Sequence, residues 1–195
     1  MSTPARRALA SAVLATTVTA GLVATGGVAS AADLRVSDPV GDPVRFSFVD
    51  GEDDVTATPA PGARSTDVTS VRFDLRNRFL VVVGQAESAG GATTAFVRVK
   101  NGGRDIYFHS TRKGGVRADS GKDCAGGTSS FDAEAATYRL RIPTSCFGTP
   151  EKARLGFALL RGATASAPSF TVDVAGKVGY DDNDDIKLSE AVARG

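Results

Sequence analysis

The chain has 195 residues, with 23 Lys and Arg against 22 Asp and Glu, and 42% of its residues are hydrophobic. These values are ordinary for a soluble globular domain. The near-neutral charge argues against a nucleic-acid partner, since such partners are bound through a basic stripe.

Residues 1–31 have the pattern of a signal peptide. Arg6 and Arg7 precede an uncharged run from Ala8 to Val28, and Ala29-Ser30-Ala31 supplies a small-residue cleavage site. We expect cleavage after Ala31, which leaves residues 32–195 as a single secreted domain with no membrane attachment. A membrane anchor is the alternative, and the pattern does not decide between Sec and twin-arginine export.

Period-two alternation of apolar and polar residues predicts strands along the rest of the chain. The segment Thr56–Thr66, which holds Pro59, Pro61 and Gly62, is predicted to be a surface loop, and Pro143–Gly148 a single helical turn. The predicted strands are Val44–Val49, Val71–Leu75, Phe79–Val83, Ala95–Val99, Asp105–Ser110, Tyr138–Ile142, Leu155–Leu159 and Phe170–Val174.

About eight short strands, divided by clusters of Gly, Pro, Asp and Ser, are typical of an all-β fold. We therefore expect an antiparallel β-sandwich of the jelly-roll or immunoglobulin-like kind. No second domain is indicated, and we expect a monomer.

Cys124 and Cys146 are the only cysteines, and an even pair in an exported chain predicts a disulfide. A loop of this size is stabilised by roughly 3 kcal/mol in chain-entropy models. The bond is expected to tie the glycine-rich, loose stretch Lys113–Ser130 to the end of the strand that finishes at Pro143.

The segment Asp67–Leu75, the hydrophobic strand after it, the Asn101-Gly102-Gly103 turn and the segment Tyr138–Gly148 together resemble small secreted actinobacterial proteins of uncharacterised function. More remotely, the strand order is similar to that of DOMON domains and family 9 carbohydrate-binding modules. The resemblance implies a sandwich that binds a ligand. It does not carry over the tryptophans that hold sugars there or the His and Met pair that holds haem, because this chain has no Trp and its single Met lies in the predicted leader.

Acidic residues gather in several predicted loops. Carboxylates from neighbouring loops are the ligands that calcium prefers, and calcium is the one cofactor that the sequence suggests. Asp181, Asn183 and Asp185 copy the first half of a calcium loop, although Ile186 stands where its turn glycine belongs. The other acids of these loops are Asp38, Asp42, Asp50, Glu52, Asp53, Asp54, Asp67, Asp182 and Asp184.

No spacing among these acids selects a catalytic pair for glycoside hydrolysis. His109 is the single histidine, and no nucleophile elbow surrounds any serine. We therefore expect no catalytic residues.

The hairpin around Asn101 carries the candidate ligand face. If Val97 and Phe108 face the core, the outer face carries Phe96, Arg98, Asp105, Tyr107 and His109. A two-residue turn is expected to pair Phe96 with Tyr107 and Arg98 with Asp105.

Aromatic rings with a polar rim stack on sugars or anchor a protein partner. The sequence therefore favours a secreted, non-catalytic binding module for an extracellular or cell-wall glycan, or for a cell-surface protein. A hydrolase that uses clustered carboxylates, and a calcium-stabilised adhesion or structural protein, are the alternatives.

Overall fold

The computed structural model describes residues 33–48, 55–90, 92–111, 113–162, 169–176 and 186–195. These residues form an all-β fold in which every paired strand is antiparallel to its neighbour. The described strands are β1 (Asp33–Ser37), β2 (Val44–Phe48), β3 (Val55–Pro59), β4 (Val68–Leu75), β5 (Phe79–Ala86), β6 (Thr93–Asn101), β7 (Arg104–Ser110), β8 (Gly115–Ala118), β9 (Asp123–Asp132), β10 (Thr137–Pro143), β11 (Lys152–Arg161), β12 (Ser169–Val174) and β13 (Ala191–Ala193).

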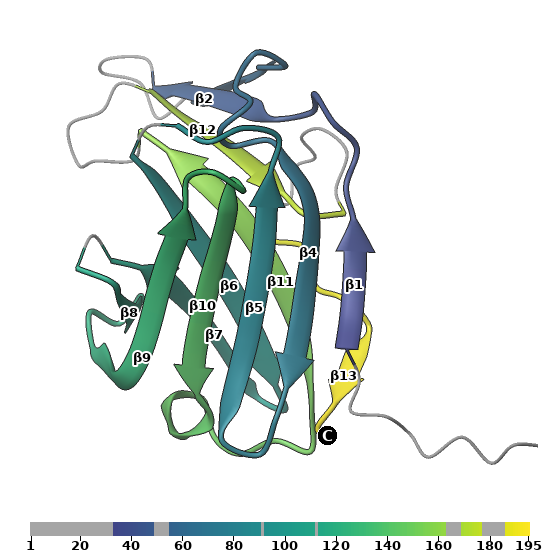
Figure 1. The fold of residues 1–195 in the computed structure, drawn as a ribbon, viewed down its shortest axis with the longest axis vertical. Coiled ribbons are helices and arrows are strands. Elements are labelled where there is room, and N and C mark those ends of the chain that lie inside the picture. Colours follow the sequence, from purple (N-terminus) through teal and green to yellow (C-terminus); the bar gives the residue numbers. More distant parts are fainter. Residues whose placement is uncertain (1–32, 49–54, 91, 112, 163–168, 177–185) are drawn as a thin grey trace, which may run out of the picture.

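The strands belong to one continuous sheet with the order β1-β4-β5-β10-β9-β8-β7-β6-β11-β12-β2-β3, and β13 pairs with β11. Figure 1 shows this sheet folded over, with β1, β4, β5, β10 and β9 in front of β7, β6 and β11. The expected count of eight strands is therefore wrong: the described residues contain thirteen strands, in a single sheet.

The core lies between the two layers. Alternate residues of each strand point inward because successive side chains of a strand leave opposite faces. Phe73, Leu80 and Leu140 from the front layer and Phe108 and Phe157 from the back layer are almost fully buried. The expected alternation in the hairpin strands is confirmed, since Val97, Val99 and Phe108 are buried in this core.

Two segments predicted to be irregular are strands. Within the expected loop Thr56–Thr66, β3 pairs with β2 at the edge of the sheet, where its terminal Pro59 is tolerated. Within the expected loose stretch Lys113–Ser130, β8 and β9 pair with each other through an irregular register. Both segments were predicted to be loops because of their glycine and proline residues, yet each contains a strand.

The predicted disulfide is confirmed. Cys124 in β9 is bonded to Cys146 in the short 3-10 helix η1 (Thr144–Cys146), with the two Cα atoms 5.8 Å apart. This helix is the single turn expected after Pro143. No helix in the described ranges is long and apolar enough to cross a membrane.

The described end of the chain packs against the outer face of β11. Arg98 Nη1 donates to the carbonyl of Ile186 at 3.1 Å, and the Ser189 N–H donates to the carbonyl of Leu155 at 2.7 Å. Gly156 allows this approach, because a Cβ atom at that position would lie 2.5 Å from the carbonyl oxygen of Lys187. The strip 186–189 therefore forms one border of the surface described next.

Candidate functional site

The outer face of β6 and β7 carries the side chains predicted as a ligand face. The pairing register differs from the expected one: Phe96 is opposite His109 and Arg98 is opposite Tyr107. Gly102 and Gly103 form the turn, and Asn101 ends the strand instead of entering the turn. The predicted direct pairs, Phe96 with Tyr107 and Arg98 with Asp105, are therefore wrong by two positions.

Arg98 nevertheless meets Asp105, diagonally across the two strands. Its Nε and Nη2 donate to the two carboxylate oxygens at 2.9 and 2.7 Å. The hydrogen bond from Arg98 and the positive charges of Arg98 and Lys100 hold the pKa of Asp105 below its ordinary value. Arg98 lies on the outer face but is buried by its neighbours. Its hydrogen bonds to Asp105 therefore join β6 to β7.

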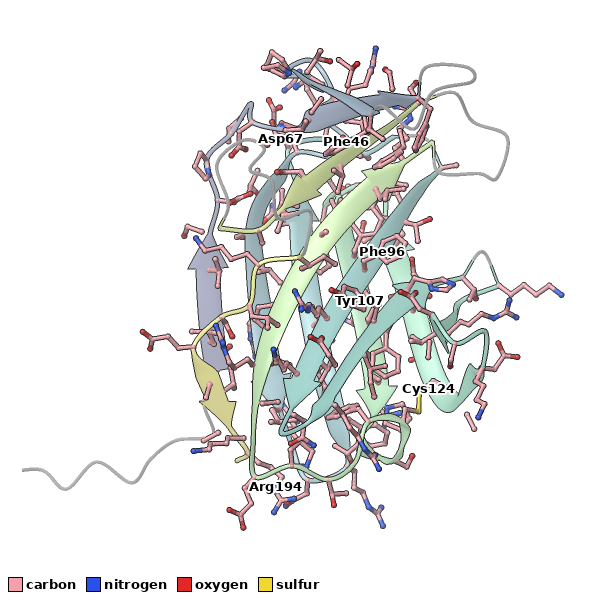
Figure 2. The ribbon with its side chains drawn as sticks, turned by 180° about the vertical axis from the view of Figure 1, so that it is seen from behind. Phe46, Asp67, Phe96, Tyr107, Cys124 and Arg194 are labelled. Atoms are coloured by element: carbon pink, nitrogen blue, oxygen red, sulfur yellow. A yellow bond between two sulfur atoms is a disulfide. The ribbon has the colours of Figure 1, made fainter. Side chains whose placement is uncertain are left out.

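Aromatic rings lie on the same face as this pair. The Arg98 guanidinium lies 5.2 Å from the centroid of the Tyr107 ring, and the rings of Phe96 and His109 are 5.6 Å apart. His109 Nδ1 is 3.4 Å from a carboxylate oxygen of Asp119. The predicted residues thus share one face, where Figure 2 shows Phe96 above Tyr107.

An apolar pocket of about 370 Å³ continues this face onto β11, β12, β2 and β3. Phe96 forms one side of it, and Phe46, Phe48 and Phe170 form the other. The Phe46 and Phe170 rings stack with centroids 5.0 Å apart, and Phe48 lies 5.8 Å from Phe170. The remaining lining residues are Asp42, Val44, Val55, Ala158, Leu160, Val172, Asp173, Val174 and Ile186.

The rim of this pocket is unusually apolar for a surface. Phe48 and Val55, which are opposite each other in the pairing of β2 with β3, are 49% and 47% exposed. Exposed apolar side chains gathered around a hollow mark a binding surface more often than scattered ones do. Sequence reasoning identified Phe96 but not the other three phenylalanines, because β2 and β12 are far from β6 in the chain.

A second feature adjoins the pocket: four aspartates that meet between the two layers at the end of the fold where Asp67 is labelled in Figure 2. Asp38 follows β1, Asp42 precedes β2, Asp67 precedes β4 and Asp173 lies within β12. One carboxylate oxygen from each of Asp38, Asp42 and Asp173 lies within 4.8 Å of the others.

Backbone N–H groups fix three of these side chains. Gly41 donates to Asp67 Oδ2 and Val68 donates to Asp173 Oδ2, each at 2.6 Å, and Gly176 donates to Asp38 Oδ1. Gly41 has a positive φ of 90°, which allows the turn between β1 and β2 to direct its N–H at Asp67.

Four other oxygens of the cluster are buried with no hydrogen-bond partner: Asp38 Oδ2, Asp67 Oδ1 and both oxygens of Asp42. Burial raises the pKa of Asp38 to about 7 and that of Asp173 to about 8, and the charges of the neighbouring aspartates add to both shifts. Burial raises the pKa of Asp42 and Asp67 as well.

The aspartate cluster contains three of the acids that the sequence singled out and one that it did not. Asp38, Asp42 and Asp67 were noted as loop acids, whereas Asp173 alternates with Val172 and Val174 and therefore had the pattern of a solvated strand face. Asp181, Asn183 and Asp185, the predicted calcium residues, lie outside the described residues.

Comparison of the chain with protein-family models, with curated protein sequences and with solved structures finds no match. The resemblance to secreted actinobacterial proteins, DOMON domains and family 9 modules therefore stays a prediction.

Proposed function

We propose that the protein is an exported, non-catalytic binding module whose ligand is a glycoside carrying an acyl or aromatic group. The observation that carries this proposal is the phenylalanine-lined pocket, which is continuous through Phe96 with the polar hairpin face. Export rests on the leader-like residues 1–31 and on the disulfide, which belongs to an oxidising compartment. A sandwich of the jelly-roll or immunoglobulin-like kind, made by folding one sheet over, is part of this proposal.

The lining of the pocket decides the ligand class. A bare sugar placed among Phe46, Phe48 and Phe170 turns most of its hydroxyl groups toward apolar side chains, which costs free energy. An acyl chain or an aromatic ring instead gains about 25 cal/mol for each Å² of apolar surface that it buries. The expectation of a glycan ligand is thereby narrowed to one with an apolar substituent.

The hairpin supplies the polar half of the surface. His109 and Asp119 lie beside Phe96, at the side of the pocket away from β2. They offer donors and acceptors to sugar hydroxyls at the point where an apolar substituent enters the pocket. Arg98 and Asp105 hold this polar edge in place through their paired hydrogen bonds.

The hydrolase alternative has less support. The carboxylates of retaining and inverting glycosidases stand about 5–5.5 Å and 6.5–9.5 Å apart and face the substrate. The oxygens of Asp38, Asp42 and Asp173 lie within 4.8 Å of one another, and Asp38 and Asp173 are buried. This arrangement favours an ion over a substrate.

The test is calorimetric titration of the purified, oxidised protein with 4-nitrophenyl β-glucoside, glucose and chitotetraose. We expect binding of the aryl glycoside and none of glucose. Phe170→Ala removes the ring that stacks on Phe46 and should weaken binding about tenfold, or about 1.4 kcal/mol.

Phe131→Ala is the matched control, because Phe131 is an exposed phenylalanine on β9, in the other layer. Its affinity should equal that of the unchanged protein. Binding of chitotetraose but not of the aryl glycoside, or equal affinities for the Phe170 and Phe131 variants, would overturn the apolar-group proposal.

A further inference from the structure

Three segments that are far apart in the sequence bring four aspartates close together, and three of these, Asp38, Asp42 and Asp173, meet at one point. The turn between β1 and β2 contributes Asp38 and Asp42, the start of β4 contributes Asp67, and β12 contributes Asp173. The hydrogen bonds of Gly41 to Asp67 and of Val68 to Asp173 join these segments in pairs. The convergence is thus a built feature of the fold and not a chance meeting of mobile side chains.

The hydrogen bonds of the cluster leave several buried carboxylate oxygens without a donor. Asp38 is 8% exposed and Asp67 is 0% exposed, and each has one oxygen held by a backbone N–H and the other without a partner. Leaving a buried acceptor unsatisfied costs about 1–3 kcal/mol, and more when the group is charged. Buried, unpartnered oxygens on side chains that are otherwise fixed indicate a ligand that is a cation or a proton donor.

No lysine or arginine of the described residues forms an ion pair with these four carboxylates. The charge of Asp67 acts on Arg64, but the Arg64 guanidinium forms its ion pair with Glu87, at 2.7 Å. Lys187 donates to the carbonyl of Gly176 and not to a carboxylate. The counter-charge that buried carboxylates require is therefore not supplied by these side chains.

The chemistry and spacing of the oxygens select the cation. Calcium takes six to eight oxygen ligands at about 2.3–2.6 Å, so opposite ligands of one ion lie about 5 Å apart. The 4.8 Å limit on the oxygens of Asp38, Asp42 and Asp173 fits that span. Magnesium requires a tighter octahedron and usually keeps several waters, which a site with three protein carboxylates in close contact does not favour.

We infer that Asp38, Asp42 and Asp173 form a calcium-binding site that links the β1–β2 turn to β12. The unpartnered oxygens of Asp38 and Asp42 are ligands, Asp173 adds a further carboxylate, and Asp67 lies beside the site as a neighbouring negative charge. The site adjoins the proposed ligand pocket, since Asp42 and Asp173 also line it, but the inference rests on the buried, unpartnered oxygens and not on the proposed ligand.

Calorimetric titration of the chelator-treated protein with calcium chloride at pH 7.5 tests the inference, with magnesium chloride in a second titration. We expect one equivalent of calcium to bind, more tightly than magnesium. The melting temperature should rise by roughly 5–10 °C when free calcium is about 100 times its Kd. Absence of calcium binding, together with an unchanged melting temperature, would overturn the inference.

Asp42→Asn distinguishes a calcium site from a cluster that binds no ion, because the two predict opposite changes of stability when calcium is present. Neither oxygen of Asp42 has a hydrogen-bond partner, so the variant keeps the side-chain shape, removes the charge and replaces one acceptor oxygen by an NH2 donor. In a calcium site it should weaken calcium binding at least tenfold. In a cluster that binds no ion it relieves repulsion, and the variant should be more stable than the parent with or without calcium.

Asp123→Asn is the matched control, because Asp123 is an exposed carboxylate paired with Arg117. It should leave calcium affinity unchanged. An equal loss of affinity in both variants would mean that calcium responds to net charge alone, and the site would be rejected.

Discussion

The hairpin and the aspartate cluster surround their carboxylates with opposite charges. Asp105 lies against Arg98, which donates two hydrogen bonds to it, and its pKa falls below the ordinary value. Asp38 and Asp173 are buried among other aspartates, and burial, with a further contribution from those charges, raises their pKa values to about 7 and about 8. At the hairpin the buried charge of Arg98 has its counter-charge in Asp105, whereas no lysine or arginine of the described residues forms an ion pair with the cluster.

The comparison bears on function. A pair that is complete within the chain fixes the geometry of a surface whatever the solution contains. A cluster that lacks its counter-charge makes part of the fold depend on what the solution supplies. The hairpin is therefore the constant part of this molecule, and the end that holds Asp38, Asp42, Asp67 and Asp173 is the conditional part.

The largest expected effect is the pH dependence of stability in chelator. Because the folded pKa values of Asp38 and Asp173 exceed the ordinary 3.8, the folded protein holds protons that the unfolded chain has released. This stability is fully present below about pH 4 and is lost as pH rises through 7 to 8. We expect the free energy of unfolding to fall by several kcal/mol, on the order of 5, as the pH rises from about 4 to 8.

Urea unfolding at pH 5 and pH 8, with chelator and with calcium, measures this effect. Calcium should restore stability at pH 8 and have little effect at pH 5, where protons already neutralise the cluster. Glu87 also faces Asp67, so Glu87→Gln serves to measure its share. A protein in chelator that is as stable at pH 8 as at pH 5 would contradict the interpretation of the cluster.

The next effect is loss of the hairpin counter-charge. Arg98→Met keeps much of the buried stem but leaves Asp105 and the Ile186 carbonyl without their donor. Because Asp105 is about one-third exposed, we expect a loss of about 2–3 kcal/mol, below the range for fully buried pairs. Urea unfolding at pH 7 with calcium present measures it, and the double variant with Asp105→Asn should recover part of the loss.

The smallest expected effect comes from an exposed pair. Arg117 Nε is 2.9 Å from Asp123 Oδ1, a distance similar to that of the hairpin pair, but both side chains are largely in solvent. Arg117→Ala should therefore cost about 0.5 kcal/mol or less in the same urea experiment. If it cost as much as Arg98→Met, burial would not be what makes the hairpin pair strong.

Local patterns were enough to predict much of the fold. Alternation located β4, β5, β6, β7, β10, β11 and β12, and the cysteine count predicted the disulfide. The Asn101-Gly102-Gly103 sequence placed the turn but not its register, because Asn101 fits equally well in the turn or at the strand end. The choice moves every cross-strand pair by two positions, which is why Arg98 and Asp105 meet diagonally.

What the sequence did not reveal depends on contacts between distant segments. Nothing local distinguishes Asp173, on an alternating strand, from a solvated aspartate; only the pairing of β12 with β2 and β11 brings it to Asp38 and Asp42. The same pairing gathers Phe46, Phe96 and Phe170 around one pocket. The aspartate cluster and the phenylalanine-lined pocket thus both depend on the order in which the strands pair.

The described end of the chain is fastened at the far end of the fold from Phe46 and Asp67, as Arg194 shows in Figure 2. The Gly195 N–H donates to the carbonyl of Leu75, and the Arg194 N–H donates to the carbonyl of Glu151. A tether joined after Gly195 would therefore leave from the end opposite Phe46 and Asp67. A surface coupled there would leave the end that holds the phenylalanines accessible to solvent.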